Sequence, residues 1–88
     1  MTVHVLIKGK VQGVFYRQST KEKAKSIGIG GTVKNEEDGS VHIIATGSKE
    51  QLDELVQWCQ RGPAKAKVEK VEVNVLPLES FSSFTIDR

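Results

Sequence analysis

Along residues 3–9, Val3, Val5 and Ile7 occupy every second position and alternate with His4, Leu6 and Lys8. A period of two predicts a strand with at least one buried face. A short run around Val33 predicts a second strand, and clear alternation predicts three more. The apolar positions of these three are Val41, Ile43 and Ala45, then Val71, Val73 and Val75, and finally Phe84 and Ile86.

Two segments carry apolar residues at helical spacing instead. The first begins near Arg17 and ends at Gly28, a residue type that commonly terminates helices. The second begins at Ser48, which forms a capping-box pattern with Gln51, and ends at Gly62-Pro63. The predicted buried faces comprise Tyr16, Thr20, Ala24 and Ile27 in the first helix, and Leu52, Leu55, Val56 and Cys59 in the second.

Turn-forming residues separate these elements. Asp38-Gly39 is a strong hairpin signal between the second and third strands. Val68 is out of phase with the valines after it, so we expect a bulge or a late start in the fourth strand, which Pro77 ends. The order strand, helix, strand, strand, helix, strand is the split βαβ, ferredoxin-like pattern. We therefore predict one α+β domain, residues 1–88, with two helices on one face of an antiparallel sheet and a short fifth strand.

The charge balance and the cysteine count narrow the class of protein. There are 13 basic and 11 acidic residues, and a net charge of +2 argues against a dedicated nucleic-acid binder. Cys59 is the only cysteine, so we interpret it as a buried apolar residue rather than a reactive thiol. The apolar run at the N-terminus is too short for a signal peptide, and no long apolar segment follows it. We expect a soluble, cytoplasmic monomer with no membrane partner.

The most informative segment is residues 9–17, which joins the first strand to the first helix. Gly9 and Gly13 let the backbone turn its N–H groups inward at a helix start, where free donors and the helix dipole favour an anion. Arg17 adds a planar guanidinium that can bind two phosphate oxygens at once. The spacing matches neither a Walker A loop nor a dinucleotide fingerprint. These residues predict a cup for a tetrahedral dianion, and the alternative is an ordinary glycine loop followed by a solvated arginine.

Asn35 ends the second strand, just before an acidic turn. From the residues alone, two interpretations stay open. Asparagine is common in turns for purely structural reasons. It is also an uncharged amide that both donates and accepts hydrogen bonds, and it could therefore orient a water molecule.

Two groups of polar residues carry side chains that can bind cations. The acidic turn Glu36–Asp38 is interpreted as a solvated hairpin rather than a calcium site. His4 and His42 lie on different predicted strands, and no third ligand has suitable spacing. We interpret both histidines as residues of the sheet surface, and we expect no metal.

The two segments just described resemble a known family. Residues 9–17 resemble the first acylphosphatase signature, Gly-x-Val-Gln-Gly-Val-x-aromatic-Arg, at every defined position. Residues 31–41 are similar to the second signature, Gly-aromatic-Val-x-Asn-x-x-x-Gly-x-Val, and Gly47 follows. Thr32 departs from that pattern, because the family has an aromatic residue there. A packing or substrate contact made by that ring is therefore in question, whereas the chemistry at Asn35 does not require it.

The resemblance implies an acylphosphatase, which hydrolyses the carboxyl-phosphate anhydride of a small acyl phosphate to a carboxylate and inorganic phosphate, without a cofactor. It assigns phosphate binding to Arg17 and water positioning to Asn35. Because the carboxylate leaves readily, positioning and electrostatics can suffice. No general base occurs in either motif, and our hypothesis is that the substrate phosphate accepts the proton of the water. The implied phosphate-binding loop comprises Gln12, Gly13, Val14, Phe15, Tyr16 and Arg17.

Two other classes of protein could use this order of elements. An RNA-binding module needs aromatic residues on its central strands to stack bases, and residues 3–7 and 41–46 contain none. A regulatory domain that only senses a phosphorylated small molecule needs the anion loop and Arg17 but no water-orienting amide. The presence of Asn35 together with Arg17 therefore favours an enzyme.

Overall fold

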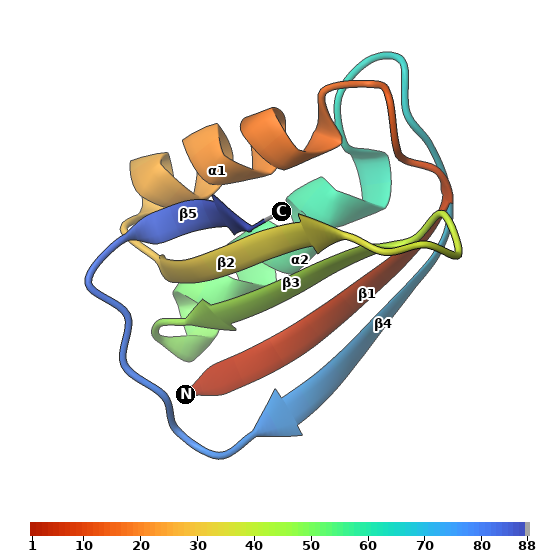
Figure 1. The fold of residues 1–88 in the computed structure, drawn as a ribbon. Helices are drawn as coiled ribbons and strands as arrows, with labels where there is room; N and C mark the ends of the chain where they lie inside the picture. The colour runs from red at the N-terminus through yellow and green to blue at the C-terminus, as the bar shows by residue number, and fades with distance from the viewer. Residues whose placement is uncertain (88) are drawn as a thin grey trace.

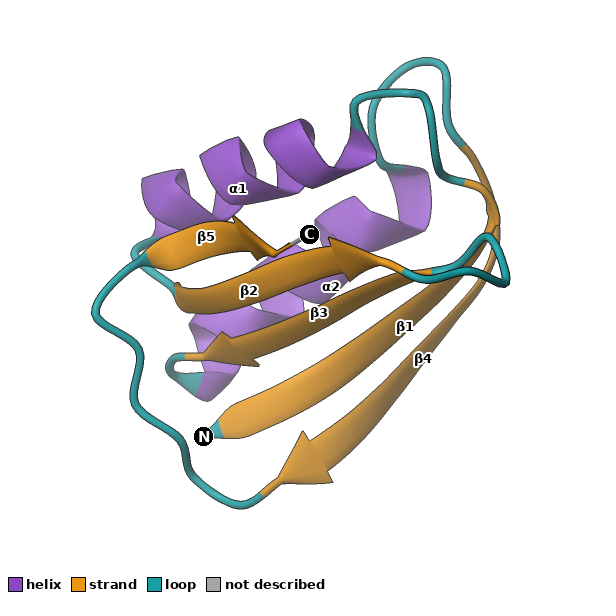
Figure 2. Ribbon diagram, viewed as in Figure 1, coloured by secondary structure: helices purple, strands orange, loops and turns teal. Residues whose placement is uncertain are grey.

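Five strands form one sheet in the order β4-β1-β3-β2-β5 in a computed structural model, which describes residues 1–87 (Figure 1). Both helices pack on the same face of this sheet (Figure 2). This architecture confirms the predicted α+β, ferredoxin-like fold. The elements are β1 (Thr2–Lys10), α1 (Tyr16–Ile27), β2 (Gly30–Asn35), β3 (Val41–Thr46), α2 (Lys49–Arg61), β4 (Lys67–Leu76) and β5 (Phe84–Asp87).

Four of the strands pair antiparallel, as expected, and the fifth does not. β1 pairs antiparallel with both β3 and β4, and β2 pairs antiparallel with β3. β5 instead pairs parallel with β2, because the segment after β4 passes along one end of the sheet and brings the chain back beside β2 in the same direction (Figure 1). As a result, β1, β2 and β5 all run the same way.

A bulge lies where the fourth strand was expected to be irregular. The β1–β4 register shifts between Lys8 and Gly9, so that Lys8 faces Lys70 and Gly9 faces Val68. Gly9 has φ 129°, and a Cβ atom there would lie 2.2 Å from the carbonyl oxygen of Lys67. Only glycine fits this position without displacing the neighbouring backbone.

The core lies between the helices and one face of the sheet. Every second residue of the central strands is buried, including Val5, Val33 and Ile43. Full burial of each large aliphatic side chain stabilises the fold by roughly 1.5–3 kcal/mol. Cys59 is fully buried in α2, and burial raises the pKa of its thiol to about 12, which agrees with an apolar role. No helix within residues 1–87 has the length and apolar composition needed to cross a membrane.

The start of α2 joins the two helices. Ser48 accepts a hydrogen bond from the Gln51 backbone N–H, and the Gln51 side-chain oxygen accepts from the Ser48 N–H at 2.8 Å. The expected capping box is therefore present. Gln51 Nε2 also donates to the carbonyl of Ile27 at 3.0 Å, which satisfies a carbonyl at the end of α1.

Tyr16 anchors the first turn of α1, and so the end of the preceding loop, to α2. Its ring is almost fully buried, and its centroid lies 5.5 Å from that of Trp58. Its hydroxyl donates to the Cys59 carbonyl at 2.7 Å. That carbonyl lies in the last turn of α2, where helix carbonyls lack intrahelical partners.

Replacing Tyr16 with Phe removes this hydrogen bond and keeps the ring. The buried Cys59 carbonyl then loses its hydroxyl donor, and we expect the free energy of unfolding to fall by about 1–2 kcal/mol. Urea denaturation monitored by circular dichroism measures the change. A variant as stable as the wild type would contradict the anchoring role of the hydroxyl.

Candidate active site

The shared direction of three strands brings the predicted site residues to one edge of the sheet. β1 and β2 run parallel to each other with β3 between them, and β5 runs parallel to β2 (Figure 1). Their carboxyl ends therefore lie at the same edge. The loop of residues 11–15 follows β1, Asn35 is the last residue of β2, and Ile86 lies near the end of β5.

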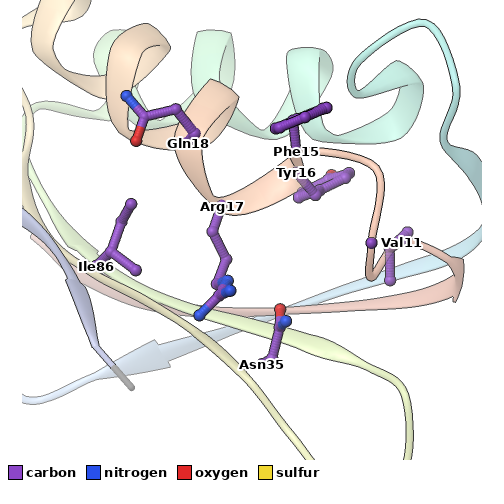
Figure 3. A pocket seen from close by; sticks show the side chains of 8 residues that line it. Val11, Phe15, Tyr16, Arg17, Gln18, Asn35 and Ile86 are labelled. Atoms are coloured by element: carbon purple, nitrogen blue, oxygen red, sulfur yellow. The ribbon is translucent and has the colours of Figure 1, made fainter.

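A cavity of about 370 Å³ lies at this edge, a size that suits a small ligand. The side chains of Arg17 and Asn35 point toward each other across it, with Ile86 and Val11 on either side (Figure 3). The structure thus brings together both residues predicted to carry the chemistry. The cavity is lined by Val11, Gly13, Phe15, Tyr16, Arg17, Gln18, Asn35 and Ile86.

The loop before α1 has an unusual backbone. Gly13 has φ 72° and Phe15 has φ 63°, and Phe15 is the only non-glycine residue with a positive φ within residues 1–87. Bulky residues rarely adopt this conformation. Phe15 is also 76% exposed, so packing does not explain the conformation. Strain of this kind persists where the surrounding structure requires it, often at a functional site.

The same loop leaves a row of backbone donors free. Within residues 1–87, the N–H groups of residues 12–17 donate no hydrogen bond, and α1 has neither a side-chain N-cap bond nor an acidic residue in its first turn. Successive free N–H groups at a helix start form an anion-binding concavity. The local field at this end of the cavity is therefore positive.

Arg17 adds a permanent charge to that field. Its side chain is half-buried, and within residues 1–87 no acidic side chain forms an ion pair with it. The guanidinium reaches across the cavity toward Asn35 (Figure 3). An unpaired guanidinium beside free N–H groups is suited to binding a phosphoryl group through several charge-assisted hydrogen bonds.

The geometry of Asn35 favours a water-orienting amide over a purely structural turn residue, the two interpretations that the sequence left open. Its amide oxygen is buried and accepts no hydrogen bond from residues 1–87. The turn is stabilised by Asp38 instead, whose carboxylate accepts from the Ser40 backbone N–H at 2.9 Å and from the Ser40 hydroxyl. These hydrogen bonds lower the pKa of Asp38. Within residues 1–87, the Asn35 amide oxygen is thus available to accept a hydrogen bond from a group in the cavity.

Two residues of the predicted loop lie outside the cavity lining. Val14 is buried beneath the loop, and the Gln12 side chain extends to the neighbouring hairpin. Their proposed contribution through backbone N–H groups stays a prediction. Sequence reasoning missed Val11, Gln18 and Ile86 as lining residues, although Val11 lies within the first signature segment. Gln18 directly follows Arg17 and could have been included, whereas Ile86 reaches the site only through the parallel pairing of β5.

Thr32 lies away from the cavity. It faces Ile44 of β3 and Thr85 of β5 in the sheet, and its neighbour Val33 is the residue turned into the core. Its side chain therefore lies on the face opposite the helices. An aromatic ring at this position would contact the outer face of the sheet rather than a ligand in the cavity.

The two histidines lie on that same outer face, as expected, but they also contact each other. His4 Nε2 and His42 Nδ1 are 2.9 Å apart, and His42 Nε2 lies 3.1 Å from the Ser40 hydroxyl. Partial burial lowers the pKa of His4, and the neighbouring His42 lowers it further by a smaller amount. Within residues 1–87, no group of three or more His, Cys, Asp or Glu side chains has the arrangement of a metal site.

Known proteins resemble this chain in both sequence and fold. The family model described as Acylphosphatase matches residues 3–86. A Pseudomonas paraeruginosa acylphosphatase is 43% identical over 86 residues, which cover 98% of this chain and 94% of the relative. A Marinobacter nauticus acylphosphatase is 46% identical over 82 residues, covering 92% and 89%.

Solved structures agree with these relatives. The structure of an acylphosphatase from Coxiella burnetii superimposes with a TM-score of 0.95 at 36% identity, covering 98% of this chain and 90% of the other. The crystal structure of acylphosphatase from Bacillus subtilis gives 0.95 at 31% identity, covering 99% and 98%. The fold and these relatives together place the chain in a class of small ferredoxin-like hydrolases. The chain belongs to the acylphosphatase family.

The backbone strain at Phe15 can be tested with two variants that both remove the ring. Glycine adopts a positive φ without steric cost, whereas alanine does not. We expect Phe15→Gly to be about 1 kcal/mol more stable than Phe15→Ala, since only glycine relieves the left-handed conformation. Urea denaturation of the pair gives the difference. Equal stability, or a more stable alanine variant, would show that the position is unstrained.

Proposed function

We propose that this protein hydrolyses acyl phosphates to a carboxylate and inorganic phosphate. In this proposal Arg17 and the N–H groups of residues 12–17 hold the phosphoryl group, and Asn35 orients the attacking water. The observation that carries it is the placement of Arg17 and Asn35 on facing sides of one cavity, where within residues 1–87 the guanidinium has no acidic partner and the Asn35 amide oxygen accepts no hydrogen bond (Figure 3). Membership of the acylphosphatase family supports the same reaction.

The chemistry requires little beyond positioning and charge. The oxygen of a water molecule attacks phosphorus, the bond from phosphorus to the acyl oxygen breaks, and its electron pair leaves with the carboxylate. Negative charge on the phosphoryl oxygens is stabilised by the Arg17 guanidinium and the loop N–H groups. These groups supply positive charge at the place where a metal ion would otherwise be needed.

Asn35 supplies orientation without changing charge. Its free amide oxygen can accept a hydrogen bond from the water and so direct the lone pair of the water toward phosphorus. The second proton of the reaction passes from the water to a phosphoryl oxygen, which makes the substrate its own base. The products are then a carboxylate and dihydrogen phosphate, and atoms and charge balance.

Removing each side chain separates the two roles. We expect Arg17→Ala to lower kcat/KM for an aromatic acyl phosphate by about 10³-fold and to weaken phosphate inhibition, since it loses a bidentate charged donor. Asn35→Ala should lower kcat by about 10²-fold, since it affects the attacking water. The inhibition constant of inorganic phosphate should stay within about threefold of the wild-type value. Arg17→Lys is the matched control, which keeps the charge without the fork. Turnover of Arg17→Ala near that of the wild type would refute the assignment.

The proposed reaction also predicts that the rate of hydrolysis is insensitive to metal chelators. Hydrolysis measured after extensive dialysis against EDTA should proceed at the untreated rate, because a guanidinium and backbone donors supply the positive charge. The rate is followed by the absorbance change of an aromatic acyl phosphate. Loss of activity on dialysis, with recovery on adding a divalent cation, would overturn the metal-free mechanism.

A further inference from the structure

The Gln12 side chain joins the two halves of the candidate site. Its Nε2 donates to the Glu36 carbonyl at 2.7 Å and to the Ser40 carbonyl at 2.9 Å. These two carbonyls bracket the turn that directly follows Asn35. The Glu36 N–H also donates to the Ser40 carbonyl at 2.9 Å, so the same oxygen closes the turn and receives Gln12. Both amide protons of Gln12 are thereby used on the hairpin rather than in the cavity.

This link matters because the sheet itself does not connect the two halves directly. The phosphate loop follows β1 and Asn35 ends β2, but β3 lies between these strands. Ladder hydrogen bonds therefore hold the loop and Asn35 only through an intervening strand. Gln12 bridges them at the edge where the cavity lies. A displacement of about 1 Å between reacting groups can cost about 10²-fold in rate.

The acceptor side of the link is itself held in place. Asp38 accepts hydrogen bonds from the backbone N–H and the hydroxyl of Ser40, and the same hydroxyl contacts His42. His42 in turn contacts His4 of β1. The Ser40 backbone, which presents its carbonyl to Gln12, is thus fixed to the outer face of the sheet. Ser40 itself is 3% exposed, whereas Asp38 lies at the surface.

We propose that Gln12 is a positioning residue for hydrolysis, which acts through Asn35. Its side chain touches no reacting atom, and it sets where the Asn35 amide lies relative to a phosphoryl group bound by the loop. The inference rests on the proposed function and extends it. Loss of the bridge should therefore misplace the water while the guanidinium and the loop donors continue to bind phosphate.

The variant Gln12→Met tests this, because methionine keeps the length of the side chain and lacks both donors. With an acyl phosphate as substrate, we expect kcat to fall at least about 10-fold. The inhibition constant of inorganic phosphate should stay within about threefold of the wild type. A structural role confined to the phosphate loop would instead raise that constant together with the loss of kcat, and this outcome would overturn the proposal.

The same substitution in an Asn35→Ala background decides whether Gln12 acts through Asn35. If it does, Gln12→Met should lower kcat less than about twofold there, since residues that act as a unit are not additive. An equal loss in both backgrounds would overturn the proposal, as would an unchanged kcat in the wild-type background. Gln12→Leu, which also lacks both donors and adds no charge, gives the same comparison if the methionine variant unfolds.

The wild-type measurement separates the two levels of inference. A wild-type protein that does not hydrolyse acyl phosphates would refute the proposed function, and with it the positioning role. If the wild type is active and the Gln12 variants lose the same factor in kcat in both backgrounds, or lose none, only the positioning role is refuted.

Discussion

The direction of the strands is the constraint on which the candidate site depends. Because β3 pairs antiparallel with both of its neighbours, β1 and β2 must run the same way and end at the same edge. That edge receives a loop rich in free N–H donors from one strand and a neutral amide from the other. The register is in turn set by the buried face of the central strands, since a slip of one residue would turn Val5 and Ile43 out of the core.

The site obtains its positive field from backbone as much as from side chains. The chain as a whole carries a net charge of only +2, so overall charge contributes little attraction for an anionic ligand. The field is local, because the loop N–H groups, the start of α1 and Arg17 all face one cavity. Tyr16 holds that helix start in place by its hydrogen bond to α2. The core therefore supports the electrostatics of the site directly, through a residue adjacent to Arg17.

Much of this could be predicted from the sequence, and the rest depends on tertiary contacts. Alternation and helix signals give the order of elements, and the two motifs give Arg17 and Asn35. The parallel direction of β5 could not be predicted, because an alternating pattern reads the same in either direction. The bridge from Gln12 to the hairpin depends on where two distant carbonyls lie. The contact between His4 and His42 likewise depends on the β1–β3 register, which the spacing of single residues does not specify.

The parallel pairing of β5 has a consequence for how the site is assembled. Gly31 of β2 pairs with Phe84, a partner far along the chain, and Ile86 of the same strand closes one side of the cavity. Contacts between residues so distant in sequence carry a large loop-closure entropy and tend to form slowly. The phosphate loop and Asn35 can meet as soon as the first three strands pair. We therefore expect the wall that Ile86 forms to be completed only after the phosphate loop and Asn35 have met.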